Sequence, residues 1–392
     1  MFSRKTKIIC FALEGLNSFA GTYYLFYLFF LMRDEYGFSN RGNLFLTAAH
    51  GCVYLFASWQ GGRFAQRVGY FRALRLGYAG MAVALAVGLL TPGLTGQIIA
   101  LLAWTIPLCL IWPTLEALVT EGEDFRGTAR MVGIYNIVWS AGSAGAYCSG
   151  GWLWQKLGRH GLYGLPLALM LVQFALALWL EHGAKRLPKS SPSAAGSHHG
   201  LEASALKQPL PPRRFLQMAW LANPFAYVAI NTVGAVVPQL AARFHLTPAE
   251  SGVFCSLWFY VRLAAFILLW QWTGWHYRFR WLLAAFVGLV FSFAALLLAP
   301  QLWIVIAAQV GFGLAVALIY YSSLFYSMDA GDTKGAHGGL HEAAIGLGVC
   351  AGPALGATAL TCFPRQPDSG TFAVTVLLLG GLGGLLWLRG RR

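Results

Sequence analysis

Residues 142–151 read GSAGAYCSGG, and residues 348–357 read GVCAGPALGA. Both stretches lie inside long apolar runs and align at a constant offset of 206 residues. Small residues recurring along an apolar helix allow neighbouring helices to approach closely within a membrane. The chain therefore carries the same membrane-helix feature twice, about half its length apart, which predicts a duplicated architecture.

Further landmarks repeat at nearly the same spacing, so the duplication extends well beyond these two stretches. Four more positions align at offsets of 208 to 211: Tyr36 with Phe244, Trp59 with Trp270, Phe71 with Phe279, and Arg126 with Lys334. A near-constant offset over many landmarks is typical of an internal repeat. We therefore predict two copies of one unit, residues 1–181 and residues 215–392.

The composition is that of a membrane protein. Hydrophobic residues make up 57% of the 392 residues and charged residues 11%, against about 45–50% and about 25% in ordinary globular domains. Apolar runs long enough to span a bilayer, about 17–25 residues, occur twelve times, at residues 8–32, 43–61, 73–91, 96–120, 129–154, 161–181, 215–241, 252–272, 280–299, 301–327, 337–361 and 371–388. This pattern predicts an all-α membrane protein with twelve transmembrane helices in two pseudo-symmetric six-helix bundles, and it excludes a soluble enzyme.

One long polar stretch, residues 182–214, separates the sixth run from the seventh. Its content of Ser, Pro, Gly and Lys is typical of a flexible linker, and we expect it to be cytoplasmic. Of the 28 Lys and Arg residues, 21 fall on the side of the N-terminus, six on the opposite side, and Arg262 within a run. Because Lys and Arg are in excess in cytoplasmic loops, we expect both termini in the cytoplasm, with the protein in the inner membrane of a bacterium.

Several other classes of protein are disfavoured. The net charge of +14 comes from short basic clusters between apolar runs, so no single basic patch indicates a nucleic-acid partner. The seven cysteines lack the spacing of a zinc site or a disulfide framework, and no phosphate-binding GxxxxGKS/T loop or HExxH motif occurs. We expect no enzymatic activity, no cofactor and no metal. The expected partners are a small-molecule solute and the lipid bilayer, and a monomer is the expected state because one chain contains both halves.

The loop after the second run reads GRFAQRVGYFR at residues 62–72. It resembles the loop signature of the major facilitator superfamily of secondary transporters, with Gln66 where that family usually has Asp. The Gly-xxx-Gly-Pro-xx-Gly element at 348–356 is similar to the superfamily's fifth-span motif of antiporters. The resemblance implies a central cavity, alternating access by rocking of one bundle against the other, and gating roles for Gly62, Arg67, Gly69, Arg72, Gly348, Gly352 and Pro353.

Arg262 is the strongest candidate for a site residue. It is the only Lys or Arg deep inside an apolar run, and a cation at the bilayer centre costs at least about 2.5–3.5 kcal/mol on insertion scales. We expect it to face a wet cavity as an anion-binding group, or to pair with an acid on a neighbouring helix. His50 falls one residue before the position that matches Arg262 in the other half. We expect His50 either to reach the centre as well or to form a hydrogen bond between helices.

Polar residues of the first run recur at spacings of three and four, which places them on one helical face. The seventh run has a matching stripe. Because polar faces are disfavoured in lipid, we expect both stripes to face inward and to bind solute through Asn17, Tyr24, Tyr227 and Asn231. Glu14 begins the first stripe, and a buried carboxyl group there can carry a proton or act as a structural acid.

His341 and Glu342 open the eleventh run, where adjacent side chains point about 100° apart. Glu342 is the stronger candidate for a proton-coupling group that faces the cavity, with a structural role at the start of the helix as the alternative. Glu116 lies toward the cytoplasmic end of the fourth run, and we expect it near Arg126 or Arg130, bracing a gate. The aromatic residues that are candidates for lining the cavity are Trp112, Trp139, Trp258, Tyr320 and Tyr321.

These features predict a secondary active transporter that moves a small organic solute by alternating access, with proton coupling through Glu14 or Glu342 as a hypothesis. Arg262 favours an anionic or hydroxyl-rich solute. One alternative is an exporter of amphiphilic drugs or metabolites, which the Gly-Pro motif suggests. Another is a membrane sensor or accessory protein that keeps the fold without moving solute. The paired polar faces favour transport, because an accessory protein has less need of them.

Overall fold

The computed structural model describes residues 4–123, 125–184, 210–330 and 334–390. These ranges contain helices joined by short turns, and no strand occurs within them. The helices of the N-terminal half are α1 (Arg4–Tyr36), α2 (Asn40–Val68), α3 (Tyr70–Leu90), α4 (Leu94–Thr120) and α5 (Phe125–Ala184). Those of the C-terminal half are α7 (Pro212–Arg243), α8 (Pro248–Phe254), α9 (Leu257–Gln271), α10 (Phe279–Leu298), α11 (Leu302–Ala330), α12 (Lys334–Cys362) and α13 (Ser369–Gly390).

α5 contains two membrane helices that follow each other without a loop. A straight helix of its 60 residues would measure about 90 Å, about three times the hydrocarbon core of a bilayer. Gly158 interrupts it with a φ of 53° and a ψ of −146°, a conformation that favours glycine because it has no Cβ. The chain turns there, so that α5 supplies both the fifth and the sixth crossing.

Nine of the described helical segments are long and apolar enough to span a membrane by composition alone, with α5 counted once. α1 and α2 fall below that threshold, and both contain buried polar residues such as Glu14, Asn17 and His50. With these two helices and the second half of α5, the described chain has the twelve crossings that its apolar runs predict. Residues 182–184 and 212–214 of the expected linker are helical, and residues 185–209 lie outside the described ranges.

The eighth crossing is broken, although the apolar run 252–272 predicts one continuous helix. α8 ends at Phe254 and α9 begins at Leu257. Gln309 of α11 satisfies backbone groups at the break: its Nε2 donates to Phe254 O at 2.7 Å and its Oε1 accepts from Trp258 N at 3.3 Å. Backbone groups inside a bilayer need such internal partners, so one glutamine on a neighbouring helix makes the break tolerable.

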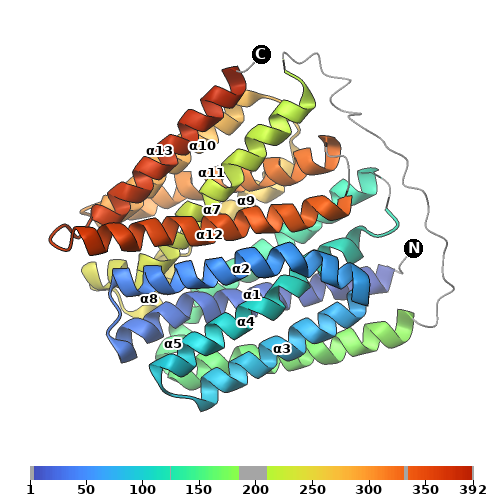
Figure 1. Cartoon of the computed structure of the whole chain (residues 1–392), viewed down its shortest axis with the longest axis horizontal. Helices are drawn as coiled ribbons and strands as arrows, with labels where there is room; N and C mark the ends of the chain where they lie inside the picture. Colours follow the sequence, from blue (N-terminus) through green and yellow to red (C-terminus); the bar gives the residue numbers. More distant parts are fainter. Residues whose placement is uncertain (1–3, 124, 185–209, 331–333, 391–392) are drawn as a thin grey trace.

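The two halves meet most extensively along α2 and α12, which lie side by side across the middle of Figure 1. A Cβ added to Gly51 would collide with the backbone of Val349 and Cys350, and one added to Gly346 would meet the backbone of Leu55. A second contact joins α5 to α8 and α9. The halves therefore touch along several helix pairs, and the close approach of α2 and α12 depends on glycine.

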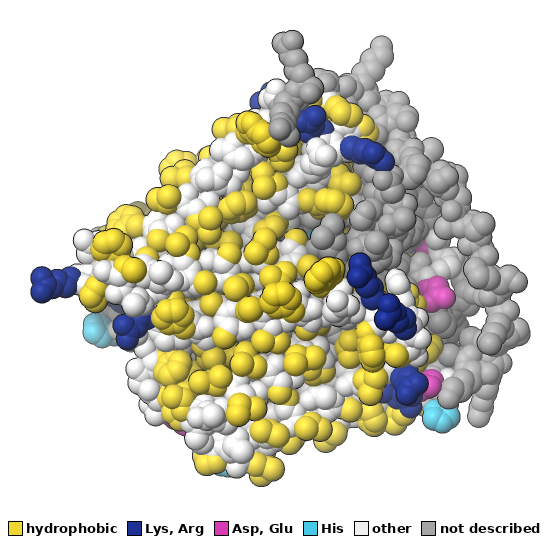
Figure 2. Space-filling view, in the orientation of Figure 1, with side chains coloured by type: hydrophobic (Ala, Val, Ile, Leu, Met, Phe, Trp, Pro, Cys, Tyr) yellow, Lys and Arg dark blue, Asp and Glu magenta, His cyan; other side chains and the backbone are white. Residues whose placement is uncertain are grey.

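The surface agrees with immersion in lipid. In Figure 2 the middle of the visible face consists of hydrophobic and uncharged groups, whereas Lys and Arg lie toward its edges. Arg214 Nη1 donates to Leu388 O at 2.9 Å, which places the beginning of α7 beside the end of α13. The chain ends and the helix ends on either side of residues 185–209 lie toward the same side of the molecule (Figure 1).

Candidate functional site

Three acidic residues from both halves lie near one another inside the helix bundle. Glu14 of α1, Glu116 of α4 and Glu342 of α12 are close enough for their charges to interact. Glu14 and Glu342 are buried, and none of the three has a described Lys, Arg or His within 4.0 Å. Acids inside a membrane are costly and commonly mark substrate or proton pathways, so this cluster is a candidate functional site.

Hydroxyl groups support two of these acids. Glu14 accepts hydrogen bonds from Ser18 Oγ at 2.8 Å and from the Tyr135 hydroxyl at 2.9 Å. Glu342 accepts one from the Tyr54 hydroxyl at 2.5 Å. Tyr54 belongs to α2 and Glu342 to α12, so this second bond crosses from one half to the other and depends on how the halves are arranged.

Arg262 lies on α9 with 6% of its surface exposed. Its guanidinium carbon is 4.4 Å from the ring centre of Trp139 and 5.0 Å from those of Trp258 and Phe259. We call these three rings the aromatic cage; such rings attract a cation through their negative faces. No acid in the described ranges lies within salt-bridge distance of Arg262, and its Nε has no hydrogen-bond partner. We expected Arg262 either to face a wet cavity or to pair with an acid. In the described structure aromatic rings stand where the acid was expected, and the wet cavity remains a prediction.

Two tyrosines connect the cation to the acids. Tyr227 of α7 and Tyr320 of α11 are both close enough to Arg262 and to Glu342 for electrostatic interaction. The ring of Tyr320 also contacts that of Trp139, with centres 5.5 Å apart. Tyr227 and Tyr320 are therefore neighbours that Arg262 and Glu342 share.

The sequence profile of the Major Facilitator Superfamily matches residues 8–353 of this chain. The chain belongs to this superfamily. Among solved structures, the nucleoside transporter NupG is similar to it with a TM-score of 0.71 and 14% identity, over 99% of this chain and 100% of that one. The human organic anion transporter MFSD10 (TETRAN) is similar with a TM-score of 0.69 and 16% identity, over 98% and 99%. No curated protein matches the sequence.

Three other predicted binding residues of this superfamily member form their contacts with residues of their own half. His50 Nδ1 forms a hydrogen bond with Thr105 Oγ1 at 2.7 Å, and the Tyr24 ring packs edge-on against Trp104 with centres 5.1 Å apart. Asn231 Nδ2 donates to the carbonyl of Tyr227, one turn earlier on α7, at 2.9 Å. These contacts stabilise helix packing, and any contact with solute remains a prediction.

Asn17 differs from these residues because its bonding capacity is unused. It is fully buried, and neither its amide oxygen nor its amide nitrogen has a hydrogen-bond partner among the described residues. Buried polar atoms nearly always have a partner, either protein or water. Asn17 therefore stays a candidate for contact with a solute or an ordered water.

The predicted gating residues fall into two structural groups. Gly348 and Gly352 bring α12 close to α7, because a Cβ at either would collide with Pro224 or Val228. Gly69 has a φ of 92° in the turn between α2 and α3, a conformation that favours glycine. The remaining members are Pro353 inside α12, Gly62 with open space around its Cα, and the exposed Arg67 and Arg72. Their positions suit packing and turning of helices, and gating itself remains a prediction.

Sequence reasoning missed Tyr54 and underrated Glu116. Tyr54 lies one turn after His50 on α2, which was the available signal, but its partner Glu342 is 288 residues away.

Glu116 was expected beside basic loop residues. It lies near Glu342 and Glu14 instead, and no ion pair joins it to Arg130 in the described structure. The side chain of Arg126 lies outside the described part. Trp139, Trp258 and Tyr320 lie near Arg262, and their lining of a cavity remains a prediction.

Proposed function

We propose that this membrane transporter is a secondary active transporter that moves a small organic solute by alternating access, and that the solute binds at Arg262. The observation that carries this proposal is a buried guanidinium with no described acid within reach and an unpaired Nε. A buried donor without a partner costs about 1–3 kcal/mol, more if charged. A solute that accepts hydrogen bonds from Arg262 would remove this cost, which favours binding there.

The same surroundings support an anionic organic solute. Arg binds carboxylate or phosphate groups in a two-pronged geometry, and the rings of Trp139 and Tyr320 offer faces and edges for an apolar or aromatic portion. The proteins with this fold include a nucleoside transporter and an organic anion transporter. Of these two classes, the unpaired guanidinium of Arg262 favours the anion.

Thermal unfolding of the purified protein tests the binding site and identifies the class of solute in the same experiment. Organic acids, nucleosides, sugars, amino acids and amphiphilic drugs are screened, because a ligand of the folded state raises the melting temperature by mass action. We expect organic acids to give the largest shift. Arg262→Gln should weaken their binding by about 10–100-fold, the value of a charged hydrogen bond, while the exposed Arg41→Gln should not. Equal shifts in wild type and Arg262→Gln would place the solute elsewhere.

Counterflow in liposomes then separates transport from sensing. Vesicles loaded with an unlabelled hit should accumulate the labelled compound, and Arg262→Gln should reduce this accumulation. A sensor or accessory protein would bind the hit and show no counterflow. An exporter of amphiphiles would instead respond to drugs in the screen and would move them only from the cytoplasmic side when energised.

We further propose that Glu14 and Glu342 carry a coupling proton. Both are buried, both accept hydrogen bonds from tyrosine hydroxyls, and neither has a described basic partner within 4.0 Å. A carboxyl group in such surroundings can change its charge when a neighbouring solute or helix moves. Proximity to Arg262 through Tyr227 and Tyr320 supports a link between proton and solute.

A further inference from the structure

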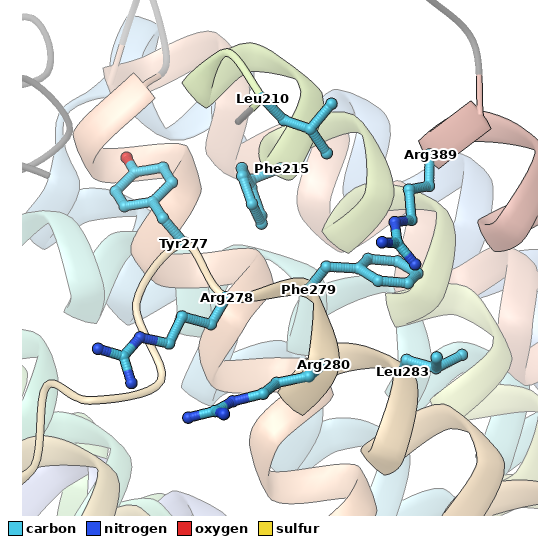
Figure 3. A pocket seen from close by; sticks show the side chains of 8 residues that line it. All are labelled: Leu210, Phe215, Tyr277, Arg278, Phe279, Arg280, Leu283 and Arg389. Atoms are coloured by element: carbon cyan, nitrogen blue, oxygen red, sulfur yellow. The ribbon is translucent and has the colours of Figure 1, made fainter. Parts of the chain in front are cut away.

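A cavity of about 560 Å³ lies at one end of the C-terminal half (Figure 3), and Arg262 is not among the residues that line it. α7 and α10 begin beside it and α13 ends beside it. Arg278, Arg280 and Arg389 line it together with apolar groups, and no acidic side chain is among the lining residues. None of the three arginines forms an ion pair with an acid in the described ranges. The cavity therefore concentrates positive charge without neutralising it.

The surrounding helices add to this preference for anions. The first turns of α7 and α10 carry a partial positive charge, although the backbone N–H groups of Arg214 and Trp281 in them already donate to Pro211 O and Arg278 O. Near the end of α13 the Leu388 carbonyl, which would repel an anion, already accepts the bond from Arg214. The Arg389 guanidinium lies over the Phe279 ring, 4.5 Å from its centre, and this contact holds it at the cavity. Figure 3 shows Arg278 and Arg280 extending to one side of the cavity and Arg389 lying on the other, so the positive charge is spread around its lining.

An exposed apolar stripe leads from the membrane surface of α13 to this cavity. Phe372, Val376, Leu379 and Leu386 are all largely exposed, and their spacings of four, three and seven keep them on one helical face. Arg389 follows Leu386 by three residues and therefore continues the same face. A molecule with a long apolar chain along the stripe would bring its head to the arginines.

We propose that the cavity binds an anionic phospholipid, with its headgroup beside Arg389, Arg278 and Arg280 and an acyl chain along the stripe of α13. The cavity lies where helices begin and end, which is the depth of lipid headgroups, and its floor at Leu210, Phe215 and Leu283 is apolar. Basic pockets between membrane helices are suited to anionic headgroups. A soluble phosphate monoester has the same head chemistry but has no chain to occupy the stripe. The inference does not depend on transport.

The test measures thermal unfolding of the full-length protein, purified in neutral detergent and depleted of lipid. Phosphatidylglycerol should raise the melting temperature by about 3 °C or more at saturation, while phosphatidylcholine and glycerol phosphate should not. The Arg278→Gln, Arg280→Gln, Arg389→Gln variant should lose this rise. A matched variant that removes three charges from exposed positions elsewhere, Arg4→Gln, Lys5→Gln and Arg63→Gln, should keep it.

Native mass spectrometry of the wild-type protein provides a readout that survives poor folding of the triple variant. From an equimolar lipid mixture, phosphatidylglycerol should be retained in preference to phosphatidylcholine, and a Lys replacement of the three arginines should retain more of it than the Gln replacement. Equal stabilisation by glycerol phosphate would show a soluble ligand and overturn the lipid assignment. Equal retention of phosphatidylglycerol and phosphatidylcholine would contradict the proposed lipid site. Loss of the rise in melting temperature in the matched variant as well would also contradict it.

Discussion

Arg262 forms no ion pair with Glu14 or Glu342 in the described structure, and Tyr227 and Tyr320 are each close enough to interact electrostatically with both Arg262 and Glu342. In surroundings that exclude water, charges several ångströms apart still influence one another strongly. We therefore predict that a solute anion bound at Arg262 changes the free energy of charging Glu342 through Tyr227 and Tyr320, which interact with both groups. This would link solute binding to proton uptake.

At the residue scale we predict that Glu14→Gln or Glu342→Gln uncouples transport from the proton gradient. A gradient of one pH unit drives about tenfold accumulation for each proton moved with the solute, and this accumulation should fall to none when the coupling acid is an amide. Counterflow, which needs no gradient, should continue. Uptake of labelled solute into vesicles with an acid exterior measures the first quantity. Full pH-driven accumulation in both variants would contradict the prediction, and the exposed Glu35→Gln serves as the control.

At the scale of elements, the contact between α2 and α12 is the most extensive one between the halves, and we propose that alternating access changes it. Gly51 and Gly346 bring the two backbones together, and the Tyr54–Glu342 bond adds a polar link across the same contact. The thiols of Cys52 on α2 and Cys350 on α12 are close enough to interact electrostatically across this contact. The chain thus contains a natural pair of groups with which this interface can be locked.

We predict that copper phenanthroline joins Cys52 to Cys350 and stops transport. The oxidant removes two electrons and two protons from the thiols, and the disulfide then ties α2 to α12 in one arrangement. Peptide mass spectrometry identifies the bond, and counterflow measured before and after treatment shows the loss, which dithiothreitol should reverse. Cys350→Ser should resist the treatment. Unchanged counterflow in the fully cross-linked protein would mean that this contact does not open during transport.

At the scale of the whole molecule, the distribution of Lys and Arg sets the orientation in the membrane. The positive-inside rule places the side that carries 21 of the 28 basic residues in the cytoplasm. The cavity lined by Arg278, Arg280 and Arg389 belongs to that side. We therefore propose that both termini, and the leaflet that supplies the anionic lipid, are cytoplasmic.

Reporter fusions test this orientation in a bacterial host. Green fluorescent protein fused after Arg392 should fluoresce, and alkaline phosphatase fused at the same place should be inactive. Alkaline phosphatase fused at Asp368, in the turn between α12 and α13, should be active because that turn lies on the opposite side. The reverse pattern at the two positions would invert the proposed topology.

The twelve crossings and the two bundles could be predicted from the sequence, and Arg262 could be singled out as a candidate, because these features depend on local properties. The length of an apolar run, the charged residues on either side of it and the energetic cost of a cation within it all follow from the local sequence. Aromatic side chains inside the spans were also expected near a cavity, and Trp139, Trp258 and Tyr320 do surround Arg262.

Partners between distant helices were decided only by the tertiary structure. Tyr54 meets Glu342 across 288 residues, Trp139 of one half covers Arg262 of the other, and Gln309 completes the broken helix at Phe254. Each depends on which helices become neighbours and how each is rotated about its axis. The packing of both bundles decides which helices are neighbours and how each is rotated. The periodicity of one run defines the polar face of its helix. It does not predict which residues of other helices contact that face.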